Sequence, residues 1–386
     1  MQIGKISQIM NVSFFKRKNN LFLLHDIICA LATLFVSLTG FADDTSSLKK
    51  SAPIYQNPFD LASGGATLTR ATQEGVMFSN PSLPAFGDGV FRSIFYVNKV
   101  SVGEGALAAG QDVIQAASNP SSNSVLKTLL EDTFKKPIYG QLDTVVGALT
   151  SHFGVAGFAT NKLDLNGQEF GTMGLPVLEV KNNGVAGVAS TFSTSLGDYL
   201  AVGVGPKYVY NTEVNTNLSV SDVTDPTQAT QKITNALKKG SGVSTNVGVT
   251  LQNRTKYFDM RVAGVVEDLG NTAFTGGVPP WLQTYNAGVG FALHDMTNAL
   301  HCALDYRDIT DVYGEDLPKK IYMGCKLLLT RYVGFSAGYL QGWPSYGMVL
   351  NLYIFRIEAG SYTKDGANQS GLAARKIYFA SLGFEI

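Results

Sequence analysis

The sequence predicts an all-β fold, an antiparallel transmembrane β-barrel of about 14 strands, with 12 as the second choice. Side chains in the C-terminal part of the chain, residues 319–386, alternate between apolar and mixed with a period of two, which is the pattern of β-strands. These segments run for about ten residues, the length that a strand needs to cross a bilayer. Soluble β-sandwiches, the competing interpretation, alternate in the same way, but their strands are typically about five or six residues long.

Composition narrows the class of protein further. Charged residues make up 16% of the chain and the formal net charge is zero, so nothing favours a nucleic-acid partner. Beyond residue 42 the sequence has no apolar run of about 18 residues, the minimum for a transmembrane helix. A membrane protein built without such helices must be a closed barrel, because open sheet edges cannot face lipid.

The N-terminus predicts the compartment. A basic cluster at residues 16–18 precedes an apolar run, Ile27 to Leu38, and small residues then lead to a cleavage position after Ala42. We interpret residues 1–42 as a secretory signal peptide. The alternative is an anchoring helix, but the uninterrupted apolar run is only about a dozen residues long, too short to span a bilayer comfortably. Together with the barrel pattern, the signal predicts the outer membrane of a Gram-negative bacterium.

Residues 43–88 are interpreted as a leader and an N-terminal plug. The first part is polar and contains proline, which favours an extended or disordered leader. The next part is rich in small residues and lacks a period of two, and its centre, Ala62 to Gly75, is predicted as a short helix. An Asn80-Pro81 turn follows. Because a barrel of this size encloses a lumen, a compact segment before the first strand is a natural plug.

The barrel itself is assigned to residues 89–386. Two insertions interrupt its β pattern: residues 104–136, interpreted as two helices, and residues 225–240, interpreted as one helix with Asp225 and Gly240 as its caps. Thirteen strands are counted in the sequence. Bacterial barrels usually have an even number of strands, so one strand must be missed or merged. The predicted ranges are 89–103, 149–165, 175–195, 199–219, 243–256, 258–269, 282–294, 298–309, 319–331, 333–342, 345–355, 356–364 and 374–386.

Alternation also sorts the charged residues of the predicted strands. If the apolar parity faces lipid, nearly every charge in the C-terminal strands points inward, away from a face where a mid-plane Arg or Lys costs about 2–4 kcal/mol. We favour an internal network of opposite charges over a selectivity constriction, because both signs are present. The predicted inward set is Lys207, Arg261, Glu267, His301, Asp305, Arg307, Lys326, Arg356 and Glu358.

The two cysteines that follow the signal peptide are Cys302 and Cys325. If their segments form a hairpin, both lie on the apolar parity and nearly opposite each other. An oxidising compartment permits a disulfide. We nonetheless expect two unpaired thiols facing lipid, because directly cross-strand positions often strain the bond.

The sequence contains none of the common motifs for cofactor or metal binding: no Walker loop, no G-x-G-x-x-G before a helix and no C-x-x-C pair. No histidine has metal-ligand spacing with another His or Cys. His301 and Asp305 share the inward face four residues apart, and we interpret them as a satisfied lumen pair in preference to a catalytic pair. The sequence therefore favours a protein that is not an enzyme and binds no cofactor or metal.

The N-terminal region resembles that of a known family, the long-chain fatty acid transporter (FadL-like) superfamily, which includes barrels similar to the PorV and TraF-like groups. The family pattern is roughly G-G-A, an Ala-rich turn and N-P-A-G-L; here Ser82 replaces the alanine, and the last glycine is absent. The matching residues are Gly64, Gly65, Ala66, Asn80, Pro81 and Leu83. Segments 200–211, 303–309 and 337–350 are similar to strands of the same superfamily. The resemblance implies a barrel of about 14 strands with an N-terminal plug, often linked to passage of hydrophobic compounds.

Two functions agree with these features. The first is passive transport of small hydrophobic compounds through a plugged barrel, whose partners would be outer-membrane lipid and the compound itself. The alternative is a non-transporting outer-membrane anchor or secretion partner that contacts other proteins through its helical insertions, since loops of that size are commonly functional.

Overall fold

The computed structural model describes residues 54–87, 91–107, 137–168, 177–219, 222, 226–295, 298–330, 332–365 and 374–386. All of them belong to one compact unit, Ser46–Ile386. The predicted signal peptide, the first part of the predicted leader and residues 108–136 of the first insertion lie outside the described residues. Among the described residues, no helix is both long and apolar enough to cross a bilayer.

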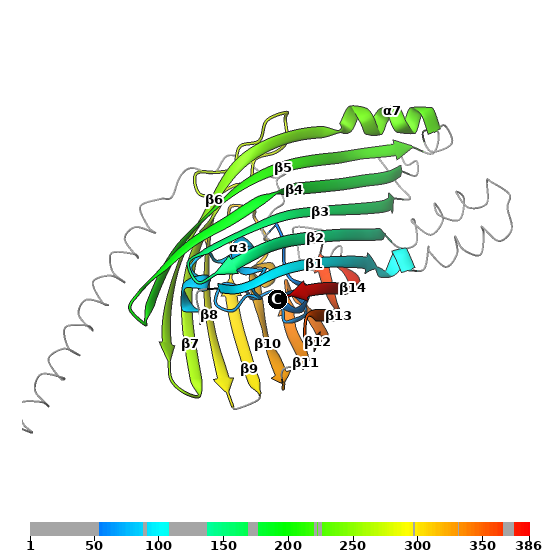
Figure 1. The fold of residues 1–386 in the computed structure, drawn as a ribbon. Helices are drawn as coiled ribbons and strands as arrows, with labels where there is room; N and C mark the ends of the chain where they lie inside the picture. The colour runs from blue at the N-terminus through cyan, green and yellow to red at the C-terminus, as the bar shows by residue number, and fades with distance from the viewer. Residues whose placement is uncertain are drawn as a thin grey trace, which may run out of the picture. The chain divides into compact units, whose positions relative to one another are not determined.

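Fourteen strands form a closed antiparallel barrel in which consecutive strands pair with each other (Figure 1). The ladder between the first and last strands closes the ring, from the Phe95–Glu385 pair to the Gly103–Ile377 pair. The predicted fold class and strand number are therefore confirmed. The first seven strands are β1 (Phe91–Gly103), β2 (Ile138–Thr150), β3 (Phe153–Gln168), β4 (Val177–Leu196), β5 (Leu200–Ser219), β6 (Lys238–Arg254) and β7 (Phe258–Glu267). The others are β8 (Thr284–His294), β9 (Ala299–Tyr306), β10 (Ile321–Leu329), β11 (Val333–Leu340), β12 (Trp343–Leu352), β13 (Phe355–Asp365) and β14 (Ala374–Glu385).

The strand missed in the sequence is β2. The strand predicted at 149–165 started too early, because its first two residues belong to the end of β2. Val145 and Leu149 of β2 point inward and are fully buried, whereas Leu142 and Val146 point outward and are exposed. With both faces apolar, this strand lacks the contrast between faces that marks the others.

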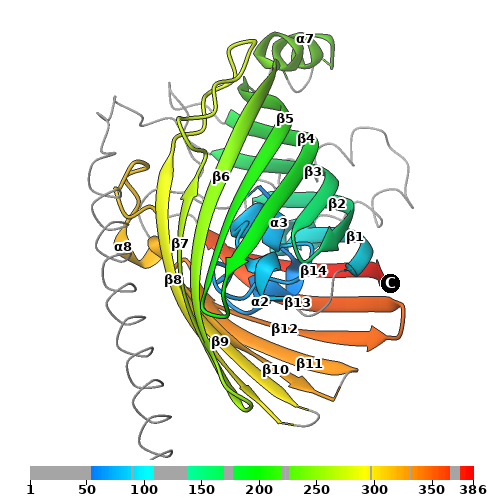
Figure 2. The same ribbon diagram turned by 60° about the vertical axis from the view of Figure 1, so that its left-hand side comes forward.

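The residues before β1 form a plug inside the ring of strands (Figure 2). Its helices are α2 (Pro58–Ala62), α3 (Val76–Ser79) and the 3-10 helix η1 (Leu83–Phe86). The predicted helix from 62 to 75 is wrong, since residues 63–75 form turns and bends. Gly64 and Gly65 adopt positive φ angles of 79° and 70°, which a right-handed helix does not allow.

The second insertion contains the predicted helix, α7 (Pro226–Ala236), which lies beside the end of β5 (Figure 1). Lys232 Nζ lies 2.6 Å from Asp222 Oδ2, which ties α7 to the residues just after β5. The prediction that Gly240 caps this helix is wrong, because Gly240 lies in β6 and pairs with Asn211 of β5. A Cβ at residue 240 would overlap the Thr275 carbonyl, so this glycine allows the loop after β7 to approach β6 closely. A further short helix, α8 (Leu317–Lys320), lies directly before β10.

The two rims of the barrel differ in their connections. At one, the short-turn rim, six hairpins close with two to four residues each, as between β2 and β3 or β12 and β13. At the other, the long-loop rim, the connections include residues 220–237, 268–283 and 307–320. In bacterial outer-membrane barrels, short turns face the periplasm and long loops face outside. The same orientation is expected for this barrel.

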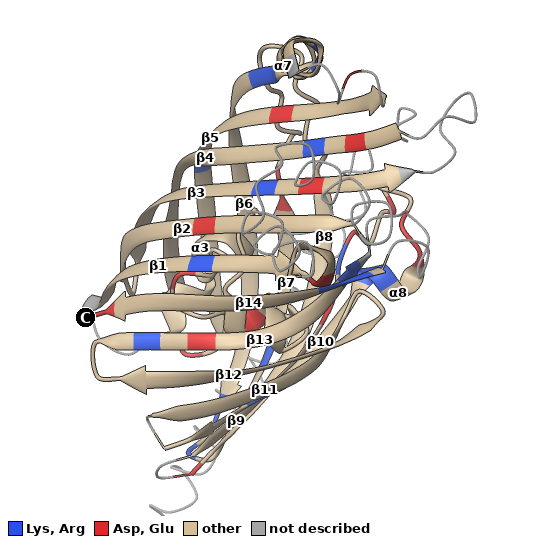
Figure 3. Ribbon diagram, turned by 90° about the vertical axis from the view of Figure 1, so that its right-hand side faces the viewer, with Lys and Arg blue, Asp and Glu red and all other residues tan. Residues whose placement is uncertain are grey.

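The outward face of the strands is apolar. Charged positions are few along the strands, and positions of opposite sign lie side by side on β1 and β2 (Figure 3). An apolar outer belt around a polar interior is the arrangement of a barrel that spans a bilayer. Exposed apolar side chains on the outward face include Ile94, Val100, Leu142, Val146, Val204, Val262, Leu304, Phe335, Ile357 and Leu382.

Cys302 of β9 and Cys325 of β10 form a cross-strand pair and are joined by a disulfide. The expectation of unpaired thiols is therefore wrong. The register explains the difference, because it places the two residues directly opposite each other and on the same face of the sheet.

The assignment of β2 can be tested with one outward residue. Val146→Arg should lower the free energy of unfolding in lipid vesicles by about 2–4 kcal/mol, because it places a charge against the hydrocarbon. Tyr353→Arg is the matched control, since Tyr353 lies in the β12–β13 turn and is 97% exposed. Urea titration of both variants measures the effect, and equal stabilities would contradict the outward placement of Val146.

Candidate functional site

The candidate site is the lumen, where the plug meets the inner wall of the barrel. A ring of fourteen strands is too wide to be filled by its own inward side chains, so another part of the chain must occupy it. The plug does so partly through apolar packing. Phe78 of α3 lies edge-on against Phe158 of β3, with ring centroids 5.2 Å apart. Met77 and Leu83 of the plug are buried in the same cluster as Val145.

Wall side chains also satisfy the irregular backbone of the plug. Asp305 Oδ2 accepts hydrogen bonds from the backbone N–H groups of Thr67 and Leu68, at 2.7 and 3.0 Å. Arg307 donates to Thr67 Oγ1 at 2.8 Å and lies 3.4 Å from Glu267. These bonds replace the helical hydrogen bonds that residues 63–75 lack. Three of the predicted inward residues therefore form one polar patch under the plug.

Ion pairs also join the plug to strands β7, β10 and β13. Asp60 of α2 pairs with Lys326 of β10. Arg70 pairs with Asp259 of β7 at 3.3 Å, and Arg261 approaches the same Asp259 oxygen at 3.1 Å. The plug thus carries carboxylates and a guanidinium that match opposite charges of the wall.

The last of these plug charges, Glu74, pairs with Arg356 of β13, and Arg356 also contacts Glu358. Elsewhere on the wall, Lys207 lies 3.3 Å from Asp268.

His301 differs from the other residues of the predicted inward set, because it forms no ion pair among the described residues. Its ring lies 5.4 Å from that of His294, and its Nε2 atom has no hydrogen-bond partner among the described residues. The structure does not bring His301 together with Asp305, whose hydrogen bonds go to the plug and to Arg307.

Glycines in the wall let the plug backbone approach the strands. A Cβ at Gly338 of β11 would overlap the backbone of Ser63 and Gly64. A Cβ at Gly64, in turn, would overlap the Met323 carbonyl of β10, while Gly65 lies against Leu340. A side chain at Gly338 or Gly64 would force a shift of the backbone, because the two backbones already touch there. Ala66, the third residue of the motif, is buried in the apolar cluster around Leu340.

The Asn80-Pro81 turn docks on the opposite wall in the same way. Asn80 Nδ2 donates to the Leu68 carbonyl at 2.6 Å and to Thr250 Oγ1 at 2.9 Å, which fixes the turn to both plug and β6. Pro81 lies against the wall, because a Cβ at Gly203 of β5 would overlap its carbonyl. The family-like residues of the N-terminal region therefore occupy contact points between plug and barrel.

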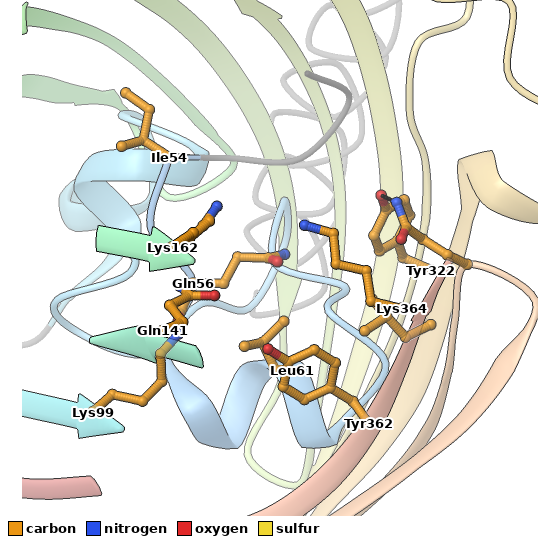
Figure 4. Close-up of a pocket in the computed structure, with 11 residues that line it drawn as sticks. Ile54, Gln56, Leu61, Lys99, Gln141, Lys162, Tyr322, Tyr362 and Lys364 are labelled. Atoms are coloured by element: carbon orange, nitrogen blue, oxygen red, sulfur yellow. Dashed lines mark hydrogen bonds between the residues drawn. The ribbon is translucent and has the colours of Figure 1, made fainter. Parts of the chain in front are cut away.

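A small pocket lies beside α2, between the plug and strands near the long-loop rim (Figure 4). Its volume is about 40 Å³. The side chain of Lys364 points into it, and among the described residues no carboxylate lies within ion-pair distance of its ammonium group (Figure 4). Lys99, another lining residue, is paired with Asp143 at 2.5 Å. The lining residues are Ile54, Gln56, Leu61, Lys99, Gln141, Lys162, Tyr322, Leu340, Gln341, Tyr362 and Lys364.

Sequence reasoning did not single out the lysines of this pocket. Lys364 has the same parity as Arg356 and Glu358 on β13, so the alternation that identified those two residues would also have identified it. Asp143 lies on β2, the strand that was missed, and its partner Lys99 was passed over with it. Among the described residues, no group of three or more His, Cys, Asp or Glu is placed to hold a metal ion.

The glycine contacts can be tested by adding a single methyl group. Gly338→Ala should lower the free energy of unfolding by about 1–3 kcal/mol, because the plug backbone must shift to make room. Gly140→Ala is the control, since a Cβ at this strand glycine would meet no atom within 4 Å. Chemical denaturation in detergent measures both. A Gly338→Ala variant as stable as Gly140→Ala would argue against tight docking of the plug.

No family model matches the sequence, and a search of curated proteins finds no match. Among solved structures, the chain resembles the TodX monoaromatic hydrocarbon channel deltaS2 mutant, at 11% identity and a TM-score of 0.49 over 86% of this chain and 98% of that chain. It resembles the Ralstonia pickettii toluene transporter TbuX at 10% identity and a TM-score of 0.49, over 85% and 97%. It also resembles a Pseudomonas aeruginosa FadL homologue at 9% identity and a TM-score of 0.33, over 90% and 99%.

Proposed function

We propose that this protein is an outer-membrane barrel for the passive transport of small hydrophobic compounds that carry an acidic or polar group, with the plug controlling passage. The observation that carries this proposal is the pocket between the plug and the long-loop rim, where Lys364 faces a partly apolar lining. Lipid around the outer belt and the transported compound are the expected partners. The protein would reach the outer membrane through the predicted signal peptide.

The lining of the pocket supports the type of compound. Leu61 of the plug, together with Tyr322 and Tyr362 of the wall, offers apolar and aromatic surface to the body of a molecule. Lys364 is half-buried, and its ammonium group forms no ion pair among the described residues, although the carboxylates of Glu315 and Asp164 are near enough to act on it electrostatically. Because a charge withdrawn from water is costly unless it is paired, an acidic group on the compound would stabilise this lysine.

The size of the pocket supports a controlling role for the plug. Its volume of about 40 Å³ is enough for only a few water molecules. A cavity that holds benzene has a volume of roughly 150 Å³. A hydrophobic compound of that size could therefore enter this pocket only if the plug or the lining side chains moved.

The contacts of the plug are suited to such movement. Many are hydrogen bonds and ion pairs to wall side chains, such as those of Asp60 and Thr67. A typical hydrogen bond contributes only about 0.5–1.5 kcal/mol net, since water replaces it when it breaks. The strands bond to each other, so the barrel does not depend on the plug for its ladder. The described helical insertion, α7, contacts β5 but leaves most of its side chains exposed, and no observation among the described residues identifies a protein partner for it.

Transport can be tested in liposomes that contain the purified protein. A variant without residues 43–88 should increase uptake of a labelled aromatic carboxylate, because the lumen is then open. Asp60→Ala combined with Lys326→Ala should increase it roughly tenfold or more, by removing a plug contact worth about 1.5–3 kcal/mol without leaving a lone charge. Glu179→Ala with Lys181→Ala removes an ion pair distant from the plug and should leave uptake unchanged. Absence of uptake even without residues 43–88 would sink the proposal.

The role of the pocket lysine can be measured separately. Lys364→Met keeps much of the side-chain volume but removes the charge, so it should weaken binding of the aromatic carboxylate roughly tenfold or more. The corresponding neutral aromatic compound should bind about equally to both proteins. Lys256→Met, in the β6–β7 turn at the other rim, serves as the control. Equal affinities of the Lys364 and Lys256 variants for the carboxylate would rule out this ligand site.

A further inference from the structure

Three carboxylates surround a single guanidinium where the plug meets β13 and β14. Arg356 of β13 contacts Glu74 of the plug through its Nη2 atom. Its Nε lies 3.1 Å from Glu358 Oε1, and its Nη1 lies 3.1 Å from Glu385 Oε2 of β14. Each of the three guanidinium nitrogens of Arg356 therefore has a carboxylate partner, and three carboxylates surround one positive charge.

The three carboxylates differ in their access to water. The side chain of Glu385 is 30% exposed, so solvent can stabilise its charge. Glu74 and Glu358 are 0% and 1% exposed. These two buried carboxylates share one guanidinium, which can neutralise only one of them. An uncompensated charge in a buried site costs several kcal/mol, so the negative charge of the second buried carboxylate must be neutralised by another group or by a proton.

Glu74 and Glu358 also lie close to each other. The amide nitrogen of Asn57 donates to Glu74 Oε1 and reaches both oxygens of Glu358, at 3.3 and 3.4 Å. Ser381 adds a hydrogen bond of 2.8 Å to Glu358 Oε2. Two carboxylates within reach of one donor cannot both remain ionised without strong repulsion, and such pairs commonly share a proton.

Among the described residues, no neighbouring group supplies the missing positive charge. Lys99 lies over the ring of Tyr55, 5.6 Å from its centroid, but its ammonium is paired with Asp143. Burial raises the pKa of the Tyr55 phenol well above its ordinary value, and the carboxylates of Glu74 and Glu358 raise it further. Tyr55 is therefore neutral. One oxygen of the pair, Glu74 Oε2, is buried and has no hydrogen-bond partner among the described residues.

We propose that Glu74 and Glu358 form a proton-binding site and hold one proton between them at neutral pH while the plug is in place. The proton belongs to the pair and is not assigned to either residue. It leaves one negative charge opposite the guanidinium of Arg356, so the buried group becomes neutral. Because Glu74 comes from the plug and Glu358 from the wall, the site exists only when the two are docked. Displacement of the plug would separate the carboxylates and release the proton.

The proposal is tested by infrared difference spectroscopy of the full-length protein in neutral detergent at pH 7. A protonated carboxyl absorbs separately from a carboxylate, and its band shifts when water is replaced by heavy water. We expect this band in the wild-type protein. The wild-type minus Glu358→Gln and the wild-type minus Glu74→Gln spectra should each show its loss, because either change leaves a single carboxylate that Arg356 can neutralise. Other buried carboxyl groups, such as Asp305, contribute equally to all three proteins and cancel.

Glu385→Gln is the matched control and should retain the band, since Glu385 lies outside the buried pair. Glutamine has the shape of a protonated glutamate, so both test variants should keep the fold, which the different gel mobility of unheated and boiled samples reports. If one variant does not fold, the other and the wild-type spectrum still decide. A wild-type spectrum without the band, or a band that persists in a folded Glu74→Gln or Glu358→Gln variant, overturns the proposal. This readout does not depend on transport, so either proposal can fail without the other.

Discussion

The structure depends on one constraint: a lumen enclosed by fourteen strands must be filled by a segment whose backbone polar groups find partners there. The plug has little regular structure, so its own backbone hydrogen bonds, such as those within α2 and α3, satisfy only part of its N–H and C=O groups. Wall residues supply what is missing, as Asp305 does for two successive N–H groups and Thr250 for the side chain of Asn80. The polarity of the inner face follows from this requirement as much as from contact with water.

The same constraint explains why replacing a charged residue of the plug requires a matching replacement in the wall. Asp60 faces Lys326, so removing either partner would leave a buried charge alone. Breaking such a pair is expensive, at about 3–5 kcal/mol, whereas the intact pair contributes little net stability. Ion pairs of this kind therefore determine where the plug docks more than how tightly it is held. That balance agrees with a plug that can leave its position while the barrel remains closed.

Much of the fold could be predicted because lipid and lumen impose opposite demands on alternate residues. The C-terminal strands show this contrast, and their inward charges, such as Lys326 and Arg356, were found by parity alone. The prediction failed where inward residues of the wall contact the plug and not water. Val145 and Leu149 are apolar although they point inward, since they pack on the plug, and β2 was therefore missed. The helix predicted at 62–75 failed because its N–H groups bond to Asp305, more than two hundred residues away in the sequence. The disulfide depended on a strand register that periodicity does not determine.

Helix α2 connects the pocket beside Lys364 with the carboxylate pair. Leu61 of α2 and Gln56, just before the helix, line the pocket. Asn57 caps α2 by accepting hydrogen bonds from the Phe59 and Asp60 N–H groups, and it also donates to Glu74 and Glu358. A bound compound that displaced Gln56 or Leu61 would act on the segment that carries Asn57. Because Asn57 is the N-cap of the same five-residue helix, that displacement would also move the donor shared by the two carboxylates. The pocket and the carboxylate pair therefore share one short helix, through which plug movement at one site would reach the other.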